Sequence, residues 1–276
     1  MFNGFKSKMK RAILATEENP IKRAKKQQIS YNPIMKECIN DNLIVAYLKL
    51  QNIEPEYDEF QRLMMNKGKH YENEVIEYIN NQLYPVVSVP PYTNLENYEK
   101  TKLLMKQMTP FIHSAKFLHN NRIGEIDLLV LSSHIHLLNP SITIDDTCKP
   151  YYIVIDIKFF KINKIKDTQL IRNSNDNVKA AKGQCCFYLQ CLNEITGDNH
   201  QKAYIIPGPI VKEGLNNIGE IDYSKNDSKF KEDIKLAEKL VQKIYKDYNS
   251  IDLNNIKGFY YLYPNMNCES YGYNTI

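Results

Sequence analysis

Two residues of opposite charge stand two positions apart in a strongly apolar segment of the chain. In YYIVIDIKFF at 151–160, Asp156 and Lys158 are the charged residues. The β-branched and aromatic composition predicts a central strand, and alternate side chains of a strand share a face, so Asp156 and Lys158 point the same way. Such a pair is costly in an apolar strand unless its members bind each other, a ligand or a metal. A structural ion pair explains it as well as a catalytic one, so its meaning depends on neighbouring residues.

A second acidic residue, Asp127, interrupts another apolar segment. Residues 111–132 predict two strands joined by a polar turn at 119–121, and Asp127 lies in the second of them. Gly124, three positions earlier, would let a backbone or a phosphate come close. The alternative interpretation is an edge strand whose Asp127 faces water.

A helix predicted over 58–83 carries a third carboxylate. Its stripe at three- and four-residue steps consists of Met65, Gly68, Glu72, Val75, Ile76 and Ile79. The Glu72 carboxylate is therefore expected to face inward. His70 lies about 200° around the helix from Glu72, and we expect it to be solvated.

A further polar pair lies on a helix predicted over 177–195. Gln184 and Tyr188 are four positions apart, so they project from one side of the helix and could reach a common point. Tyr188 could equally be a core residue.

Three carboxylates and one lysine suit a single chemical task. Carboxylate oxygens are hard ligands that bind Mg²⁺ or Mn²⁺ and leave positions open for water and a substrate phosphate. Such a centre would polarise a phosphoryl oxygen and help ionise the attacking water in phosphodiester hydrolysis. Lys158 would position the nucleophile or stabilise developing negative charge.

The ordered set of these motifs resembles the PD-(D/E)XK nucleases, and most closely their RecB-like branch, which includes lambda exonuclease. The matching segments are G-K-H-Y-E at 68–72, G-E-I-D at 124–127, D-I-K at 156–158 and Q-C-C-F-Y at 184–188. The resemblance covers roughly residues 60–210. It implies that Glu72, Asp127 and Asp156 bind one or two metal ions and that Lys158 is catalytic. It further implies that Gln184 and Tyr188 organise the site and the DNA.

One feature of some RecB-like nucleases is not expected here. Their iron–sulphur cluster uses one cysteine before the core and three after it. This chain has Cys38 before the core but only Cys268 after it, because Cys185, Cys186 and Cys191 lie inside the predicted 177–195 helix. We expect these three to pack as free thiols, which favours a reducing compartment.

The elements that would position these residues predict an α/β protein. The resemblance implies a restriction-endonuclease-like core, with a central mixed sheet flanked by helices in the order αβββαβ and with extra helices at both ends. We expect a basic tail over 1–30 and a single domain over 31–276, with its core at about 58–210 and a helical extension at about 211–276. The other expected elements are helices at 33–51, 94–108 and 228–248, strands at 85–89 and 202–206, and irregular segments at 134–150 and 161–176.

Composition and charge narrow the classes of protein. No apolar run approaches the roughly 20 residues of a membrane helix, and the N-terminal segment lacks the apolar stretch of a secretory signal. The net charge is +4, yet residues 1–30 hold eight basic and two acidic side chains and so carry +6. Such a tail could follow DNA phosphates, act as a nuclear-import signal or simply be solvated. We therefore expect an intracellular protein, cytoplasmic or nuclear.

Three functions remain open at this point. The leading hypothesis is an end-dependent DNA exonuclease in recombination, repair or defence, because Q-x-x-x-Y is typical of the end-processing members. A structure- or sequence-specific endonuclease would use the same metal site. The third is a non-catalytic nucleic-acid-binding module. The expected partner is DNA, double- or single-stranded, and for the leading hypothesis its ends. Assembly into a homo-oligomer is left open.

Overall fold

The computed structural model describes residues 58–91, 94–120, 122–142, 149–208, 215 and 217–248, together with the backbone of 29–30. The chain divides into two compact units, one formed by 1–62 with 235–276 and the other by 63–234. Most of the predicted basic tail and the predicted helix at 33–51 lie outside the described residues. The expected domain boundaries stay a prediction.

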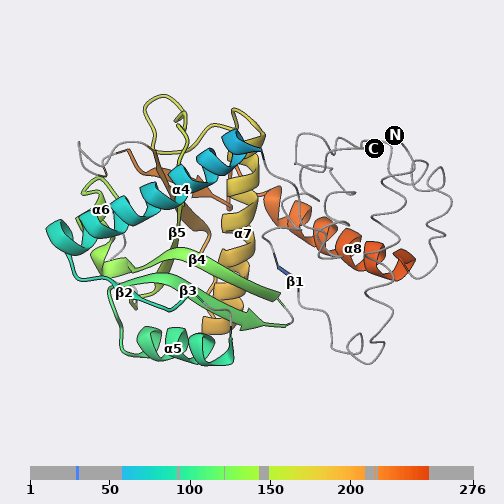
Figure 1. The fold of residues 1–276 in the computed structure, drawn as a ribbon, viewed down its shortest axis with the longest axis horizontal. Coiled ribbons are helices and arrows are strands. Elements are labelled where there is room, and N and C mark those ends of the chain that lie inside the picture. Colours follow the sequence, from blue (N-terminus) through green and yellow to red (C-terminus); the bar gives the residue numbers. More distant parts are fainter. Residues whose placement is uncertain are drawn as a thin grey trace. The chain divides into compact units, whose positions relative to one another are not determined.

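A mixed six-stranded sheet is the centre of the second unit (Figure 1). Among the described residues its strand order is β2-β3-β4-β5-β6-β7. The β2–β3 and β5–β6 pairs are parallel, and the β3–β4, β4–β5 and β6–β7 pairs are antiparallel. The bounds are Val87–Ser88, Phe111–His119, Arg122–Leu131, Tyr152–Lys158, Lys202–Pro207 and Gly219–Asp222. A further two-residue strand, β1 (Ile29–Ser30), belongs to the first unit.

The β3–β4 hairpin is formed where the sequence predicts it. The two strands are joined by a two-residue turn, in which Asn120 takes a left-handed conformation with φ 48°. Asparagine tolerates this conformation better than most residues, and tight hairpin turns require it. The central strand β5 is buried along nearly its whole length, as expected for a strand covered on both faces.

Helix α4 (Glu59–Tyr78) and the π-helical turn η3 (Ile79–Leu83) cover one face of the sheet. Tyr71, Val75 and Ile79 pack in a buried cluster that includes Leu128 of β4 and Ile155 of β5. The predicted stripe is wrong at its N-terminal end, because Met65 is exposed. The burial of α4 begins only at Tyr71, so the apolar residues of the earlier turns have no sheet beneath them.

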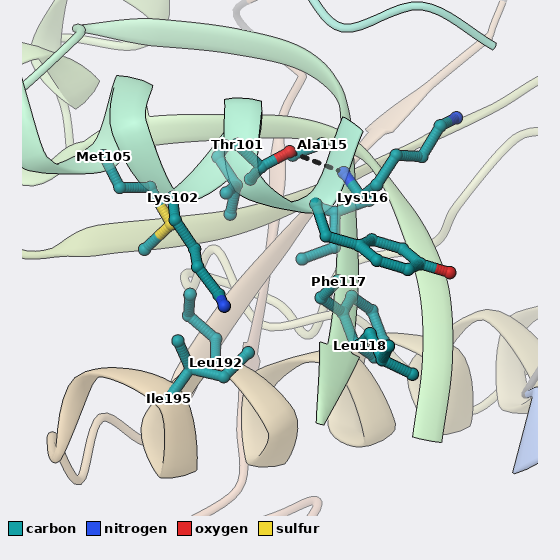
Figure 2. Close-up of a pocket in the computed structure, with 12 residues that line it drawn as sticks. Thr101, Lys102, Met105, Ala115, Lys116, Phe117, Leu118, Leu192 and Ile195 are labelled. Carbon is teal, nitrogen blue, oxygen red and sulfur yellow. Dashed lines mark hydrogen bonds between the residues drawn. The ribbon is translucent and has the colours of Figure 1, made fainter. Parts of the chain in front are cut away.

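Helices α5 (Leu95–Lys106) and α7 (Asp176–Thr196) cover the opposite face. Each begins at an asparagine, Asn94 or Asn175, whose side chain accepts a hydrogen bond from the backbone N–H three residues later. Between these helices and the hairpin lies a small apolar pocket, lined in part by Met105, Phe117 and Leu192 (Figure 2). Cys185, Cys186 and Cys191 of α7 are buried free thiols, as predicted.

The sequence-based expectations miss some short elements. The segment expected to be irregular from 134 contains α6 (Ile135–Leu138) after the 3-10 turn η4 (Ser132–His134), and strand β7 was not expected. Helix α8 (Phe230–Tyr248) agrees with the helix predicted over 228–248. None of the helices in the described ranges combines the length and the apolar character needed to span a bilayer.

Candidate active site

The two aspartates lie side by side at the point where β4 and β5 separate. Leu128 pairs with Ile155 in the antiparallel register, and continuing that register by one residue brings Asp127 beside Asp156. An oxygen of Asp127 accepts a hydrogen bond from the backbone N–H of Ile157 at 2.8 Å. Asp127 therefore caps the end of the ladder with its side chain. The two carboxylates, 29 positions apart in sequence, face the same small region.

Lys158 lies between these carboxylates. Its ammonium donates to Asp156 Oδ1 at 2.7 Å and is 3.9 Å from Asp127 Oδ2. The prediction that Asp156 and Lys158 share a face is confirmed by this contact. The other oxygen of Asp156, Oδ2, is buried and has no hydrogen-bond partner in the described part of the chain.

Glu72 reaches the site from the helix side. Its neighbour Tyr71 is buried and donates a hydrogen bond of 2.6 Å to the backbone oxygen of Pro207. Pro207 pairs with Lys158 in the β5–β6 register, so this bond fixes α4 beside the end of β5. The Glu72 carboxylate is close enough to Asp127 for its negative charge to raise the pKa of Asp127. His70 points away, is well exposed and pairs with Glu74, in agreement with the sequence-based expectation.

Gln184 and Tyr188 bond to each other beneath the aspartates. The Gln184 amide donates to the Tyr188 hydroxyl at 2.9 Å, and both side chains are buried. The charges of Asp127 and Asp156 both act on Tyr188, whose pKa is raised first of all by burial. The sequence suggested that Gly124 lets a backbone or a phosphate come close, but the space beside it is filled by side chains. A Cβ there would meet the ring of Phe117 and lie 2.9 Å from the ring of Tyr188.

The electrostatic balance of the site is unfavourable to its own carboxylates. Burial raises the pKa of Asp156 to about 8 despite the opposing charge of Lys158, and the charge of Asp127 and a carboxyl–carboxyl hydrogen bond with it contribute to the rise. Burial also raises the pKa of Asp127, which Glu72 raises further and Lys158 lowers. Burial by itself would lower the pKa of Lys158, but the two aspartates outweigh it and raise that pKa. The single ammonium of Lys158 is therefore the only positive charge among the described side chains of this region that opposes its three acidic groups.

This donor set suits a hard cation in its chemistry. The unpartnered oxygen of Asp156 supports this, because a buried carboxylate oxygen normally has a partner. Asp227 also has an unpartnered buried oxygen, and Asp156 differs from it in having a second carboxylate, Asp127, beside it. Asp156, Asp127 and Glu72 are the residues that would hold Mg²⁺ or Mn²⁺. In the arrangement seen here, however, no three His, Cys, Asp or Glu side chains of the described residues are grouped to hold a metal. The Lys158 ammonium lies between the aspartates, where it takes the part of a cation.

Two residues that the sequence did not single out also lie at the site. His113 of β3 is 3.2 Å from Glu72, and Cys185 of α7 is near enough to feel the charges of Asp156, Lys158 and Asp127. A lone histidine in FIHSAKF carries no local signal, because its partner is 41 positions away. The apolar pocket of Figure 2 is separate from the site, since its lining includes none of the six predicted site residues.

Comparisons with known proteins do not indicate a function for this chain. The chain matches no protein-family model, and no curated protein is significantly similar to it. The structure brings together Glu72, Asp127, Asp156 and Lys158, with Gln184 and Tyr188 packed against them. Their roles in binding and catalysis stay predictions.

Proposed function

We propose that this protein is a divalent-metal-dependent DNA nuclease with a restriction-endonuclease-like core of the PD-(D/E)XK type. The observation that carries the proposal is the meeting of Asp127, Asp156 and Lys158 at the ends of two paired strands, with a buried oxygen of Asp156 left without a partner. The mixed sheet with helices on both faces supports it, because it positions this group from a rigid scaffold.

Each residue has a part that follows from its surroundings. Asp156, Asp127 and Glu72 hold the cation, which supplies Lewis-acid stabilisation of the phosphate and a more acidic water. The Ile157 N–H fixes the orientation of the Asp127 carboxylate. Lys158 provides positive charge where negative charge develops on the phosphoryl oxygens. Gln184 and Tyr188 support the aspartates from the α7 side.

Within this class we favour an end-dependent exonuclease over an endonuclease. The Q-x-x-x-Y pair on α7 carries this preference, because the resemblance associates it with end-processing nucleases. Incubation of the protein with linear and closed circular DNA, each with Mg²⁺, Mn²⁺ or EDTA, tests it. We expect loss of linear DNA with either metal, intact circles and no reaction in EDTA. Nicked circles would instead show an endonuclease.

Lys158→Ala tests the chemistry of the site. We expect the cleavage rate to fall by about 10²- to 10³-fold, while DNA binding is retained. Lys179→Ala is the matched control, because Lys179 is an exposed lysine that pairs only locally with Asp176 on α7. Equal cleavage by the wild type and Lys158→Ala would rule out the proposed role of the lysine.

A non-catalytic nucleic-acid-binding module is the second candidate. It is favoured by the finding that the acidic side chains of the described residues are not grouped as a closed metal site. Under this alternative Lys158→Ala leaves function unchanged, and no metal supports cleavage. A DNA-binding assay run beside the cleavage assay separates the two functions.

A further inference from the structure

His113 joins helix α4 to two strands of the sheet at the edge of the candidate site. Its side chain is mostly buried, and its Nε2 lies 3.2 Å from Oε1 of Glu72. On the other side of the ring, Nδ1 lies 3.0 Å from the Ser88 hydroxyl of β2. Ser88, His113 and Glu72 form a hydrogen-bonded row that ends on a carboxylate assigned above to the cation.

The chemistry of the partners fixes the hydrogens in this row. An ionised carboxylate can only accept, so Nε2 of His113 carries the hydrogen and donates it to Glu72. In a neutral ring Nδ1 is then an acceptor, and it receives the hydrogen of the Ser88 hydroxyl. The row therefore runs in one direction, from Ser88 through His113 to Glu72. One oxygen of Glu72 is held by the ring, and the second oxygen is the one that can turn to a cation.

The backbone beside His113 is also unusual. Ser114 has φ 54°, a left-handed conformation, in the middle of β3. The β3–β4 register places Ser114 opposite Asp127, between the pairs His113 with Leu128 and Ala115 with Ile126. Residues of this kind persist only where their surroundings hold them, and they gather at functional sites. The Ser114 hydroxyl lies 3.2 Å from Nε2 of His113, so the strained residue also contacts the ring.

We propose that His113 is a positioning residue that orients Glu72 for the divalent cation. The inference rests on the proposed function, because it assigns Glu72 to the cation. Partners that orient a ligand in this way typically change metal affinity by about 10- to 100-fold when they are removed. Removing His113 should therefore raise the metal concentration needed for half-maximal cleavage, and it should change the cleavage rate at saturating metal much less.

Two substitutions of His113 test the proposal. His113→Leu removes the donor, and we expect it to raise the Mn²⁺ concentration for half-maximal cleavage by about 10- to 100-fold. His113→Gln keeps an N–H that can reach Glu72, so it should recover a large part of this loss. Ser88→Ala, which removes only the start of the row, should shift the requirement in the same direction by less. A residue that only supports the fold would lower the melting temperature and leave the Mn²⁺ requirement unchanged.

His70→Leu is the matched control, since His70 pairs with a glutamate of the same helix but is largely exposed. Its Mn²⁺ requirement should equal that of the wild type. If the wild type cleaves no DNA, the proposed function fails, and calorimetric titration of wild type and His113→Leu with Mn²⁺ then decides the inference. Tighter binding by the wild type than by His113→Leu supports it. Equal affinities, or a wild type that binds no Mn²⁺, overturn it.

Discussion

At the scale of single residues, position decides what an aspartate can do. The tetrapeptide Gly-Glu-Ile-Asp occurs twice, at 124–127 and at 219–222. Asp127 lies beside Asp156, and its pKa is raised by burial. Asp222 accepts hydrogen bonds from the backbone and hydroxyl of Ser224, which lower its pKa although burial opposes them. The same motif is therefore part of the site in one strand and a local turn cap in the other.

Asp156→Asn should remove the stabilisation that a metal gives. A ligand present at about 100 times its Kd adds about 2.7 kcal/mol to the free energy of unfolding, which corresponds to roughly 5–10 °C in Tm for a domain of this size. We expect Mn²⁺ to raise the Tm of the wild type by about this amount and to leave that of Asp156→Asn nearly unchanged. Thermal unfolding with Mn²⁺ and with EDTA measures both values.

Asp222→Asn provides the matched control for this experiment. Its side-chain oxygen can still accept from Ser224, and the residue lies outside the candidate site. The variant should respond to Mn²⁺ as the wild type does. A full Mn²⁺ response in Asp156→Asn would show that Asp156 is not a metal ligand.

The sequence predicted which residue types form the candidate site, but it did not predict the contacts between them that depend on the packing of distant elements. Asp156 and Lys158 could be placed on one face because alternation in a strand is a local rule. The contact of His113 with Glu72 depends on how α4 packs on β3, and no local pattern in the sequence encodes it. The same holds for the unpartnered oxygen of Asp156, which is a property of the folded surroundings.

At the scale of elements, the glycine of one motif makes room for the tyrosine of another. Gly124 in β4 faces the rings of Phe117 in β3 and Tyr188 in α7. Phe117 and Tyr188 contact each other edge to face with ring centroids 5.5 Å apart. Helix α7 can therefore approach the hairpin closely only because residue 124 has no side chain. The spacing of Gln184 and Tyr188 from the aspartates depends on that approach.

Gly124→Ala should destabilise the fold and disturb the site. The added methyl group meets two rings held in the core, and overpacking of this kind costs about 1–3 kcal/mol. Gly68→Ala on α4 is the matched control, because nothing lies within 4 Å of a Cβ there. In a helix interior that change stabilises by up to about 1 kcal/mol. Urea unfolding should move the two midpoints in opposite directions, and equal shifts would contradict the explanation.

A buried ion pair ties α7 to the turn before α8. Lys182 donates to Asp227 at 2.8 Å and to the backbone oxygen of Ile171 at 2.6 Å, and both charged side chains are almost fully buried. Lys182→Met leaves the Asp227 carboxylate buried and unpaired, which costs about 3–5 kcal/mol. The double variant Lys182→Met, Asp227→Leu should recover much of this loss. Chemical denaturation of the three proteins measures the coupling, and a double variant no more stable than Lys182→Met would contradict it.

The longer elements followed from periodicity and the shorter ones did not. Tyr152–Lys158 and Asp176–Thr196 have enough apolar residues at one period to fix their type and nearly their bounds. Strand β7 has only four residues, two of them acidic, and it forms because β6 offers it an edge to pair with. The exposure of Met65 has a similar cause, since the helical period continues beyond the part of α4 that the sheet covers.

At the scale of the whole molecule, the charge is divided unevenly along the chain. The whole chain has a net charge of +4. Residues 1–30 have a net charge of +6, so the remaining residues have a net charge of −2. Most of these thirty residues lie outside the described ones. A nearly neutral body has little attraction for DNA at a distance, whereas a strongly basic segment binds phosphates and releases counterions. Affinity and cleavage should therefore depend on different parts of the chain.

Neutralising part of the tail should weaken DNA binding and reduce its dependence on salt. The tail variant replaces four residues by Gln: Lys6, Lys8, Lys10 and Arg11. Each lost phosphate contact lowers the slope of log K against log salt by about 0.9, so the slope should fall by up to about 4. The control variant replaces four exposed lysines of the body by Gln: Lys102, Lys106, Lys225 and Lys229.

The control removes the same net charge, so it separates a local contact from a change in total charge. We expect its salt slope to stay close to that of the wild type, and we expect the tail variant to cleave DNA at the wild-type rate once DNA is saturating. Titrations of labelled DNA at four salt concentrations, with cleavage rates at saturating DNA, give both quantities. Equal slopes for the two variants would show that the tail contacts no phosphates. A tail variant slow even at saturation would place the tail within the catalytic step.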